Sequence, residues 1–138
     1  MTPLPGDILR AAARAVEAVY PQEGCGLILQ GPDGLEVLPV PNISATPRRH
    51  FELAPGELLR ALRLPGHRLD AIFHSHPDGS AALSAQDRLA AAPGGNLLFP
   101  GVLQVVFAVE AGRARRFAVH RWFHGRWEVE EEGDLPLR

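Results

Sequence analysis

The chain of 138 residues has no lysine, one cysteine and no long hydrophobic run. With a single cysteine, Cys25, an internal disulfide is excluded, which fits a reducing compartment. The formal net charge of -2 provides no electrostatic attraction to nucleic acid or to an anionic membrane. The segment MTPLPGDILR lacks the basic start and apolar stretch of a secretory signal, and no apolar run approaches a membrane span. We therefore expect a cytoplasmic protein without a nucleic-acid or membrane partner.

The composition is that of an ordinary globular protein, with 46% hydrophobic and 22% charged residues. A chain of this length can bury a core without disulfides or a structural metal. No internal repeat or long linker interrupts it, so we expect one domain over residues 1–138. All 14 positive side chains are arginine, which leaves no side-chain amine that could receive an isopeptide bond.

Helical and extended patterns mix along the chain. After Asp7, a candidate N-cap, apolar residues recur at helical spacing until Pro21. A second helix is expected from Pro55 to Pro65 or Gly66, and a third over residues 84–92. Strands are expected at 25–30, 35–40, 69–76, 102–110, 115–123 and 126–132. This mixture predicts an α/β fold in which helices cover a mixed sheet.

The segment HSHPDGSAALSAQD, residues 74–87, carries the strongest chemical signal. Alternate residues of a strand face the same side, so His74 and His76 can aim at one point. Ser84 stands where a helix N-cap would be, and Asp87 then lies in the first helical turn. Two imidazoles and one carboxylate leave a fourth position for water, which is typical of catalytic zinc. Zinc lowers the pKa of such a water to about 7.

Two simpler interpretations of this segment stay open. Ser84 and Asp87 match the common capping pattern of a helix, and histidines on a strand are often core or surface residues. The string HSHPD also overlaps the H-x-H-x-D-H signature of metallo-β-lactamase-like hydrolases, but residue 79 is glycine rather than histidine. The chain is also short for that fold. We therefore interpret Asp78 as a loop residue near the site and Asp87 as the third ligand.

HSHP, followed at fixed offsets by a serine and an aspartate, resembles the motif of the JAMM (MPN+) metalloproteases. That motif also includes a glutamate at the start of an early strand, and PQEGCGLILQG supplies Glu23 there. The likeness runs over roughly residues 5–130 and includes Asn42, Phe51 and PGV at 100–102, where prokaryotic members often have similar residues. It implies the JAB/MPN fold, a three-layer α-β-α sandwich like that of cytidine deaminases.

The same resemblance implies a role for each matching residue. One zinc ion per chain would be held by His74, His76 and Asp87, and its water would attack an amide carbonyl. Glu23 is implied as the general base that returns the proton to the leaving amine. Ser84 is implied as the donor to the developing oxyanion. Read alone, Glu23 would be a solvated loop residue.

The remaining reactive or aromatic residues have ordinary structural interpretations. Cys25 is expected to be a small buried hydrophobe rather than a nucleophile. Trp122 and Trp127 flank the final turn and are expected in the core rather than along a groove. The other histidines are expected at the surface or in turns: His50, His67, His120 and His124. The arginines at 113, 115 and 116 are expected in a solvated hairpin turn.

The chain resembles only the compact core of the family, without the insertions that grip ubiquitin in eukaryotic members. Compact prokaryotic members of this size more often resemble enzymes that act on the Gly-Gly tail of small ubiquitin-like sulfur-carrier proteins. We therefore expect such a tail as substrate. Two alternatives stay open, a non-catalytic MPN scaffold that binds a partner protein and a zinc amidase that acts on small amino-acid conjugates. The sequence leaves the oligomeric state undetermined.

Overall fold

The computed structural model describes residues 3–137. Of the domain expected over 1–138, residues 1, 2 and 138 lie outside this range. The elements are α1 (Gly6–Glu17), β1 (Cys25–Gly31), β2 (Gly34–Val40), α2 (Pro55–Leu62), β3 (Arg68–Pro77), α3 (Ala85–Ala91), the short 3-10 helix η1 (Pro93–Gly95), β4 (Leu103–Glu110), β5 (Arg113–Phe123) and β6 (Arg126–Asp134). No helix in this range is long and apolar enough to cross a membrane.

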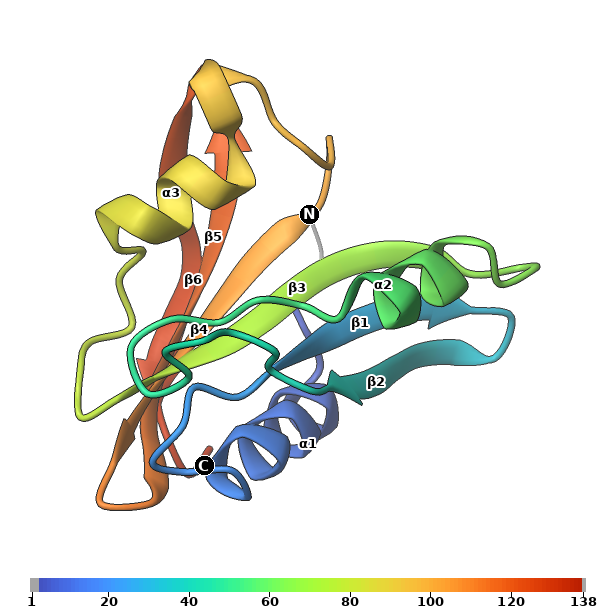
Figure 1. Ribbon diagram of the computed structural model, residues 1–138. Coiled ribbons are helices and arrows are strands. Elements are labelled where there is room, and N and C mark those ends of the chain that lie inside the picture. The colour runs from blue at the N-terminus through green and yellow to red at the C-terminus, as the bar shows by residue number, and fades with distance from the viewer. Residues whose placement is uncertain (1–2, 138) are drawn as a thin grey trace.

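The strands form one six-stranded sheet in the order β2-β1-β3-β4-β5-β6 (Figure 1). Only β3 and β4 run parallel, and every other neighbouring pair is antiparallel, so the sheet is mixed. A parallel pair needs a crossover connection, and here that connection carries α3 and η1. The crossover brings the start of α3 back toward the carboxyl end of β3, where His74 and His76 lie.

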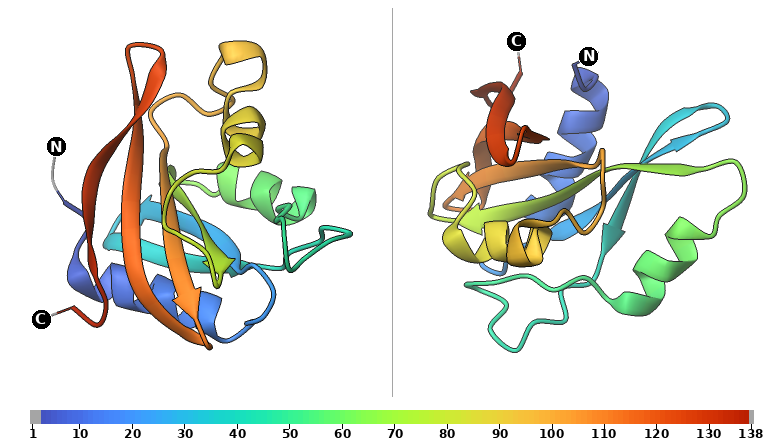
Figure 2. Two further views of the ribbon diagram at one scale, coloured as in Figure 1. Left: turned by 90° about the vertical axis from the view of Figure 1, so that its left-hand side faces the viewer. Right: turned by 90° about the horizontal axis from the view of Figure 1, so that it is seen from above.

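Helices cover both faces of the sheet (Figure 2). The apolar side of α1 packs on one face, in a core that includes Phe73 of β3 and Val119 of β5. Ile72 belongs to a second cluster on the opposite face, together with Ala61 of α2. Because side chains alternate along a strand, His74 and His76 share the face of Ile72. The expected three-layer α-β-α architecture is confirmed.

The first helix starts differently from the sequence-based expectation. Pro5, not Asp7, occupies the N-cap position, and no side chain caps the helix. The carbonyl of Pro5 accepts the amides of Ile8 and Leu9, both at 3.1 Å. Pro5 is already in an extended conformation, with φ -59° and ψ 146°, so the helix begins directly after it. Asp7 lies in the first turn, where its negative charge still favours the helix N-terminus.

The two tryptophans do not join the core. Trp122 of β5 pairs with Trp127 of β6 at the end of the hairpin, and both rings are only half-buried. Their centroids lie 5.3 Å apart at an interplanar angle of 73°. Each ring therefore covers the other across the strands instead of packing between sheet and helix.

Candidate metal centre

Three ligand atoms from two elements meet at the carboxyl end of β3. The Nε2 atoms of His74 and His76 lie 3.1 Å apart. Asp87, in the first turn of α3, places its Oδ2 atom 3.1 Å from Nε2 of His74 and 3.0 Å from Nε2 of His76. His74 is completely buried and Asp87 is 7% exposed. The structure therefore brings together the three residues that the sequence suggested as ligands.

This arrangement fits a small divalent cation. In a tetrahedral site with bonds of about 2.0–2.1 Å, neighbouring ligand atoms lie about 3.3–3.4 Å apart, so slight outward movements would suffice. The two imidazole nitrogens and the Asp87 oxygen make three contacts with one another. One proton shared between the two imidazoles could form a hydrogen bond in only part of these contacts. Burial lowers the pKa of His76, but Asp87 and the Ser80 carbonyl outweigh it and raise that pKa. The surroundings thus favour positive charge at this point.

A hydrogen bond on the side of the His76 ring away from the centre determines which ring nitrogen carries the hydrogen. Its Nδ1 atom lies 2.8 Å from the carbonyl oxygen of Ser80, and a carbonyl can only accept, so Nδ1 carries the hydrogen. In the neutral ring, Nε2 then presents its lone pair to the centre, as a metal ligand requires. The His74 ring is held by stacking on Phe51, at 4.2 Å between centroids and 21° between planes. Burial lowers the pKa of His74, which favours its neutral form.

Asp87 is oriented by a complete capping box. Its backbone amide donates to Ser84 Oγ, and its Oδ2 atom accepts the amide of Ser84, both at 3.0 Å. Burial alone would raise the pKa of Asp87, but hydrogen bonds from His74 and His76 outweigh it and hold that pKa well below the usual range. Asp87 is therefore both a helix cap and a carboxylate that faces two imidazoles. Ser84 is exposed beside it, and its Oγ atom acts only as an acceptor, from the amide of Asp87, among the described residues.

Glu23 is not a solvated loop residue, although it lies between α1 and β1. It is 5% exposed, and its Oε1 atom is buried with no hydrogen-bond partner in the part of the chain that the structure describes. One of its carboxylate oxygens lies within 4.8 Å of ligand atoms of His74 and His76. Burial raises the pKa of Glu23 to about 7, and the neighbouring Asp87 also raises it, against the lowering influence of His76. A buried carboxylate titrating near neutrality has the properties of a general base.

Two carboxylates could therefore complete a site with the histidines. One carboxylate oxygen of Glu23 lies within 4.8 Å of ligand atoms of both imidazoles, whereas Oδ2 of Asp87 lies 3.0–3.1 Å from each Nε2 atom. The shorter distances favour the carboxylate of Asp87 as the group that would share a cation with the two histidines. Glu23, within 4.8 Å of the imidazole nitrogens, is near enough to act on the same point directly or through one water.

Asp78, the rival ligand from the sequence, faces elsewhere. Its Oδ2 atom accepts the hydroxyl of Tyr20 at 2.8 Å, and its Oδ1 atom accepts the amide of Ala111 at 3.2 Å. Its φ of 55° lies in the left-handed region, where the chain turns at the end of β3. Asp78 thus ties this turn to the α1 side and to the turn between β4 and β5.

Hydrogen bonds position Glu23 through residues that sequence reasoning did not single out for this role. The amide of Gly24 donates to Ser75 Oγ at 2.8 Å, and the amide of Ser75 donates to the carbonyl of Gly24 at 3.0 Å. Asn42 Nδ2 donates to the carbonyl of Glu23 at 2.9 Å and to that of His50 at 3.0 Å. Asn after proline in a loop is a recognisable signal for such backbone bonding. Ser75 carried no signal, because its partner is distant in sequence.

His120 was expected at the surface or in a turn, and the structure corrects this. It lies on β5, is 5% exposed, and its Nε2 atom is 2.9 Å from the carbonyl oxygen of Ala81. The cause is the sheet register, which pairs His120 with Gln104 on the face covered by the loop before α3. His124 is exposed in the β5–β6 turn as expected. His50 and His67 are half-buried, and His67 lies 3.3 Å from Glu36.

A pocket of about 380 Å³ opens beside the centre, next to His74 and Asp87. Its other lining residues are mainly apolar and come from the loop before α2, from α2 itself and from the segment after α3, among them Leu53, Leu58, Leu98 and Phe99. An elongated ligand could therefore approach the centre with one end in apolar surroundings.

The fold and the site define a JAB/MPN-type domain, and comparison with known proteins agrees. Residues 5–122 match the family of prokaryotic homologs of the JAB domain, and the chain belongs to this family. Over 122 residues, 84% of this chain and 81% of the relative, the identity is 30% to the desampylase of Haloferax volcanii.

Two further relatives extend the comparison. Over 70 residues, 49% of this chain and 47% of the relative, the identity is 39% to a probable TtuB-protein conjugate cleaving protease of Thermus thermophilus. A JAB1/MPN domain protein from Archaeoglobus fulgidus superimposes with a TM-score of 0.54 at 17% identity, over 91% of this chain and 92% of that one. At this identity the likeness supports the fold alone.

Proposed function

We propose that this protein is a zinc-dependent isopeptidase that hydrolyses an amide bond at the C-terminal Gly-Gly tail of a ubiquitin-like or sulfur-carrier protein. The observation that carries the proposal is the convergence of His74, His76 and Asp87 within 3.1 Å, with the buried carboxylate of Glu23 nearby. The names of the relatives from Haloferax and Thermus, a desampylase and a conjugate-cleaving protease, support hydrolysis of protein conjugates.

The donor set is suited to one catalytic zinc ion. His74, His76 and Asp87 would hold it, since two neutral imidazoles and a carboxylate are common ligands of catalytic zinc. When bound, zinc polarises a carbonyl group and makes water a nucleophile at neutral pH. The Ser80 carbonyl keeps His76 in the required tautomer, and the Ser84 amide holds the carboxylate of Asp87 in place.

Glu23 would move the proton. Its carboxylate accepts a proton from the attacking water and then delivers it to the nitrogen of the leaving amine. The Oε1 atom is buried, and none of residues 3–137 gives it a hydrogen bond that would compete for the proton. Its pKa of about 7 matches a group that must both take up and release a proton at neutral pH.

Ser84 would stabilise the developing negative charge on the carbonyl oxygen of the scissile bond. Its Oγ atom already accepts the amide of Asp87 at 3.0 Å, so the orientation of the side chain is set by the capping box. Within the described residues Oγ only accepts, so its hydrogen would be available to a substrate, and the residue is exposed. A positioned donor at such a point stabilises the oxyanion more than the neutral substrate.

One observation also favours a small-molecule substrate. The pocket beside His74 and Asp87, at about 380 Å³, lies within the range typical of small-molecule sites. A zinc amidase acting on amino-acid conjugates would use the same centre. The two candidates differ in whether a folded carrier protein is needed for turnover.

The first test is elemental analysis of the purified protein and of a His74→Ala/His76→Ala double variant. We expect about one zinc per chain in the first and none in the second. Turnover is then measured on a carrier-protein conjugate, on a tail peptide and on small amides, with Glu23→Gln as the inactive control that retains zinc. Because the enzyme has no lysine, it cannot itself accept the carrier through a side-chain amine. Turnover of small amides alone would favour the amidase.

A further inference from the structure

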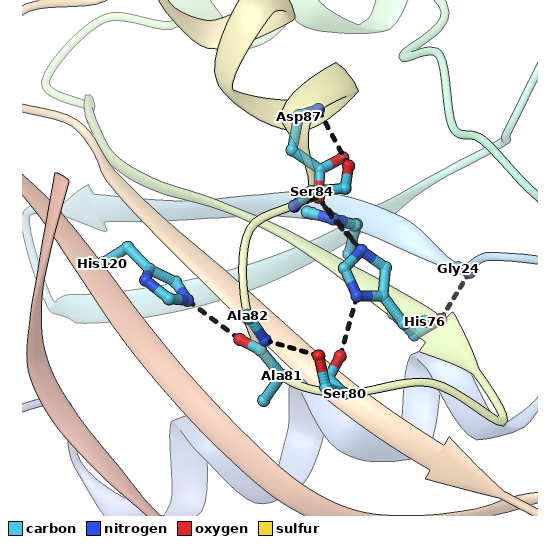
Figure 3. Close-up of polar contacts among 10 residues, drawn as sticks. Gly24, His76, Ser80, Ala81, Ala82, Ser84, Asp87 and His120 are labelled. Atoms are coloured by element: carbon cyan, nitrogen blue, oxygen red, sulfur yellow. Dashed lines mark hydrogen bonds and ion pairs between the residues drawn. The ribbon is translucent and has the colours of Figure 1, made fainter.

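The loop between β3 and α3, residues 78–84, connects the two histidines to the aspartate. Its chain crosses the sheet face above β4 and β5 before α3 begins, as Figure 3 shows for Ser80, Ala81 and Ala82. Ser80 offers its carbonyl to His76, and Ser84 caps the helix that holds Asp87. A shift of this loop would therefore move both sides of the centre.

Packing alone restrains this loop weakly. Ala81 and Leu83 point into the protein and are buried, at 7% and 6% exposure, but Ser80, Ala82 and Ser84 are exposed. A hollow of about 500 Å³ lies beside the loop, and its floor includes the small side chains of Ala108 and Ala118. The loop therefore borders open space on this side.

One buried side chain reaches the loop from this floor. His120 Nε2 lies 2.9 Å from the carbonyl oxygen of Ala81, and since a carbonyl only accepts, Nε2 carries the hydrogen. The neighbouring carbonyl, that of Ser80, takes the Nδ1 hydrogen of His76. Two consecutive carbonyls of the loop are thus fixed by two histidine rings, one inside the centre and one outside it (Figure 3).

We propose that His120 is a positioning residue of the metal centre. Its hydrogen bond to Ala81 holds the loop so that the Ser80 carbonyl stays on His76 and the cap at Ser84 stays aligned with Asp87. His120 does not itself touch the ligand atoms that converge at the centre. The inference rests on the proposed zinc-dependent function, and it adds a residue from β5 to a centre otherwise built from the chain before β1 and from β3 and α3.

The test compares three variants. His120→Phe fills a similar space without a donor, and His120→Gln retains an N–H group at a similar reach. Val119→Ala is the control for general destabilisation, because Val119 is the adjacent buried residue on the opposite face, within the α1 core. Zinc affinity is measured by competition with a chromophoric chelator, and hydrogen exchange of residues 78–84 is measured on metal-free protein.

We expect His120→Phe to weaken zinc binding about tenfold, the effect typical of losing a partner that orients a ligand. Exchange in residues 78–84 should accelerate in the same variant. His120→Gln should restore the zinc affinity to within about threefold of wild type, a rescue that a mere packing role would not give. Val119→Ala should lower the melting temperature without changing the zinc affinity.

Other results separate the two proposals. If wild type binds zinc and His120→Phe binds it equally well, or if Val119→Ala loses as much affinity, the positioning role is wrong and the proposed function stands. Unchanged exchange of the loop in His120→Phe would also overturn the positioning role. If wild type binds no zinc, the proposed function fails, and the positioning role fails with it.

Discussion

Replacing Asp87 and Asp78 in turn by asparagine tests which carboxylate belongs to the metal centre. Asp78 begins the connection between β3 and α3 and Asp87 lies in the first turn of α3, and each substitution removes one charge with almost no change in shape. Asp87 Oδ2 lies 3.0–3.1 Å from both imidazole nitrogens, whereas the oxygens of Asp78 bond to Tyr20 and Ala111. The pair of variants therefore compares a carboxylate that contacts the two histidines with one that does not.

The expected magnitudes follow from these contacts. Loss of a group that merely orients a metal ligand costs about 10–100-fold in affinity, so Asp87→Asn, which would lose a proposed ligand, should weaken zinc binding by more than about 100-fold. The asparagine oxygen can still accept the amide of Ser84, so the helix should remain capped. Asp78→Asn should leave zinc affinity unchanged. It should lower the free energy of unfolding by about 0.5–1.5 kcal/mol, because the asparagine side chain has one acceptor oxygen where the aspartate has two.

The assay is competition with a chromophoric chelator, together with urea unfolding of the metal-free proteins. Equal zinc affinity in both variants would contradict the ligand assignment. A large loss in Asp78→Asn with none in Asp87→Asn would restore Asp78 as the ligand, and the geometry of the centre would have to change on metal binding.

Three further predictions concern Ser75, Cys25 and Glu23. Ser75→Ala leaves the buried amide of Gly24 without its side-chain acceptor, which should lower the free energy of unfolding in urea by about 1–3 kcal/mol and reduce turnover with zinc affinity retained. Burial raises the pKa of Cys25 to about 12, so its thiol should resist Ellman's reagent at pH 8 and react only after unfolding. Glu23 must be deprotonated to accept a proton, so kcat/KM should fall as the pH drops below its pKa of about 7. A bound cation would move this acid limb lower, and Glu23→Gln should abolish turnover at every pH while zinc stays bound.

The secondary structure followed closely from sequence because apolar periodicity and turn residues act locally. The expected strand over 69–76 is observed as β3 (Arg68–Pro77), and the expected helix over 84–92 as α3 (Ala85–Ala91). Proline and glycine mark the ends of both patterns. The start of α1 was placed too late, since the extended Pro5 provides the first carbonyl of the helix and Asp7 is not needed as a cap.

Residues that depend on sheet register could not be placed from sequence. His120 looks like any histidine in a strand, and only the pairing of β4 with β5 brings it beneath the loop before α3. Glu23 is similar, because its burial depends on the loop that Asn42 ties to the chain before β1. The motif indicated which residues could act together, but the tertiary pairing determined how each is held.

The capping pattern at Ser84 and Asp87 was at first an argument against a metal site, since such patterns usually do nothing but begin a helix. In the structure the cap and the candidate ligand are the same carboxylate, and one oxygen atom meets the Ser84 amide and both imidazoles. A free aspartate side chain loses rotational freedom on binding an ion, whereas Asp87 has already lost it when the helix forms. The cap therefore lowers the entropic cost of metal binding, and the structural role becomes a reason to expect the chemical one.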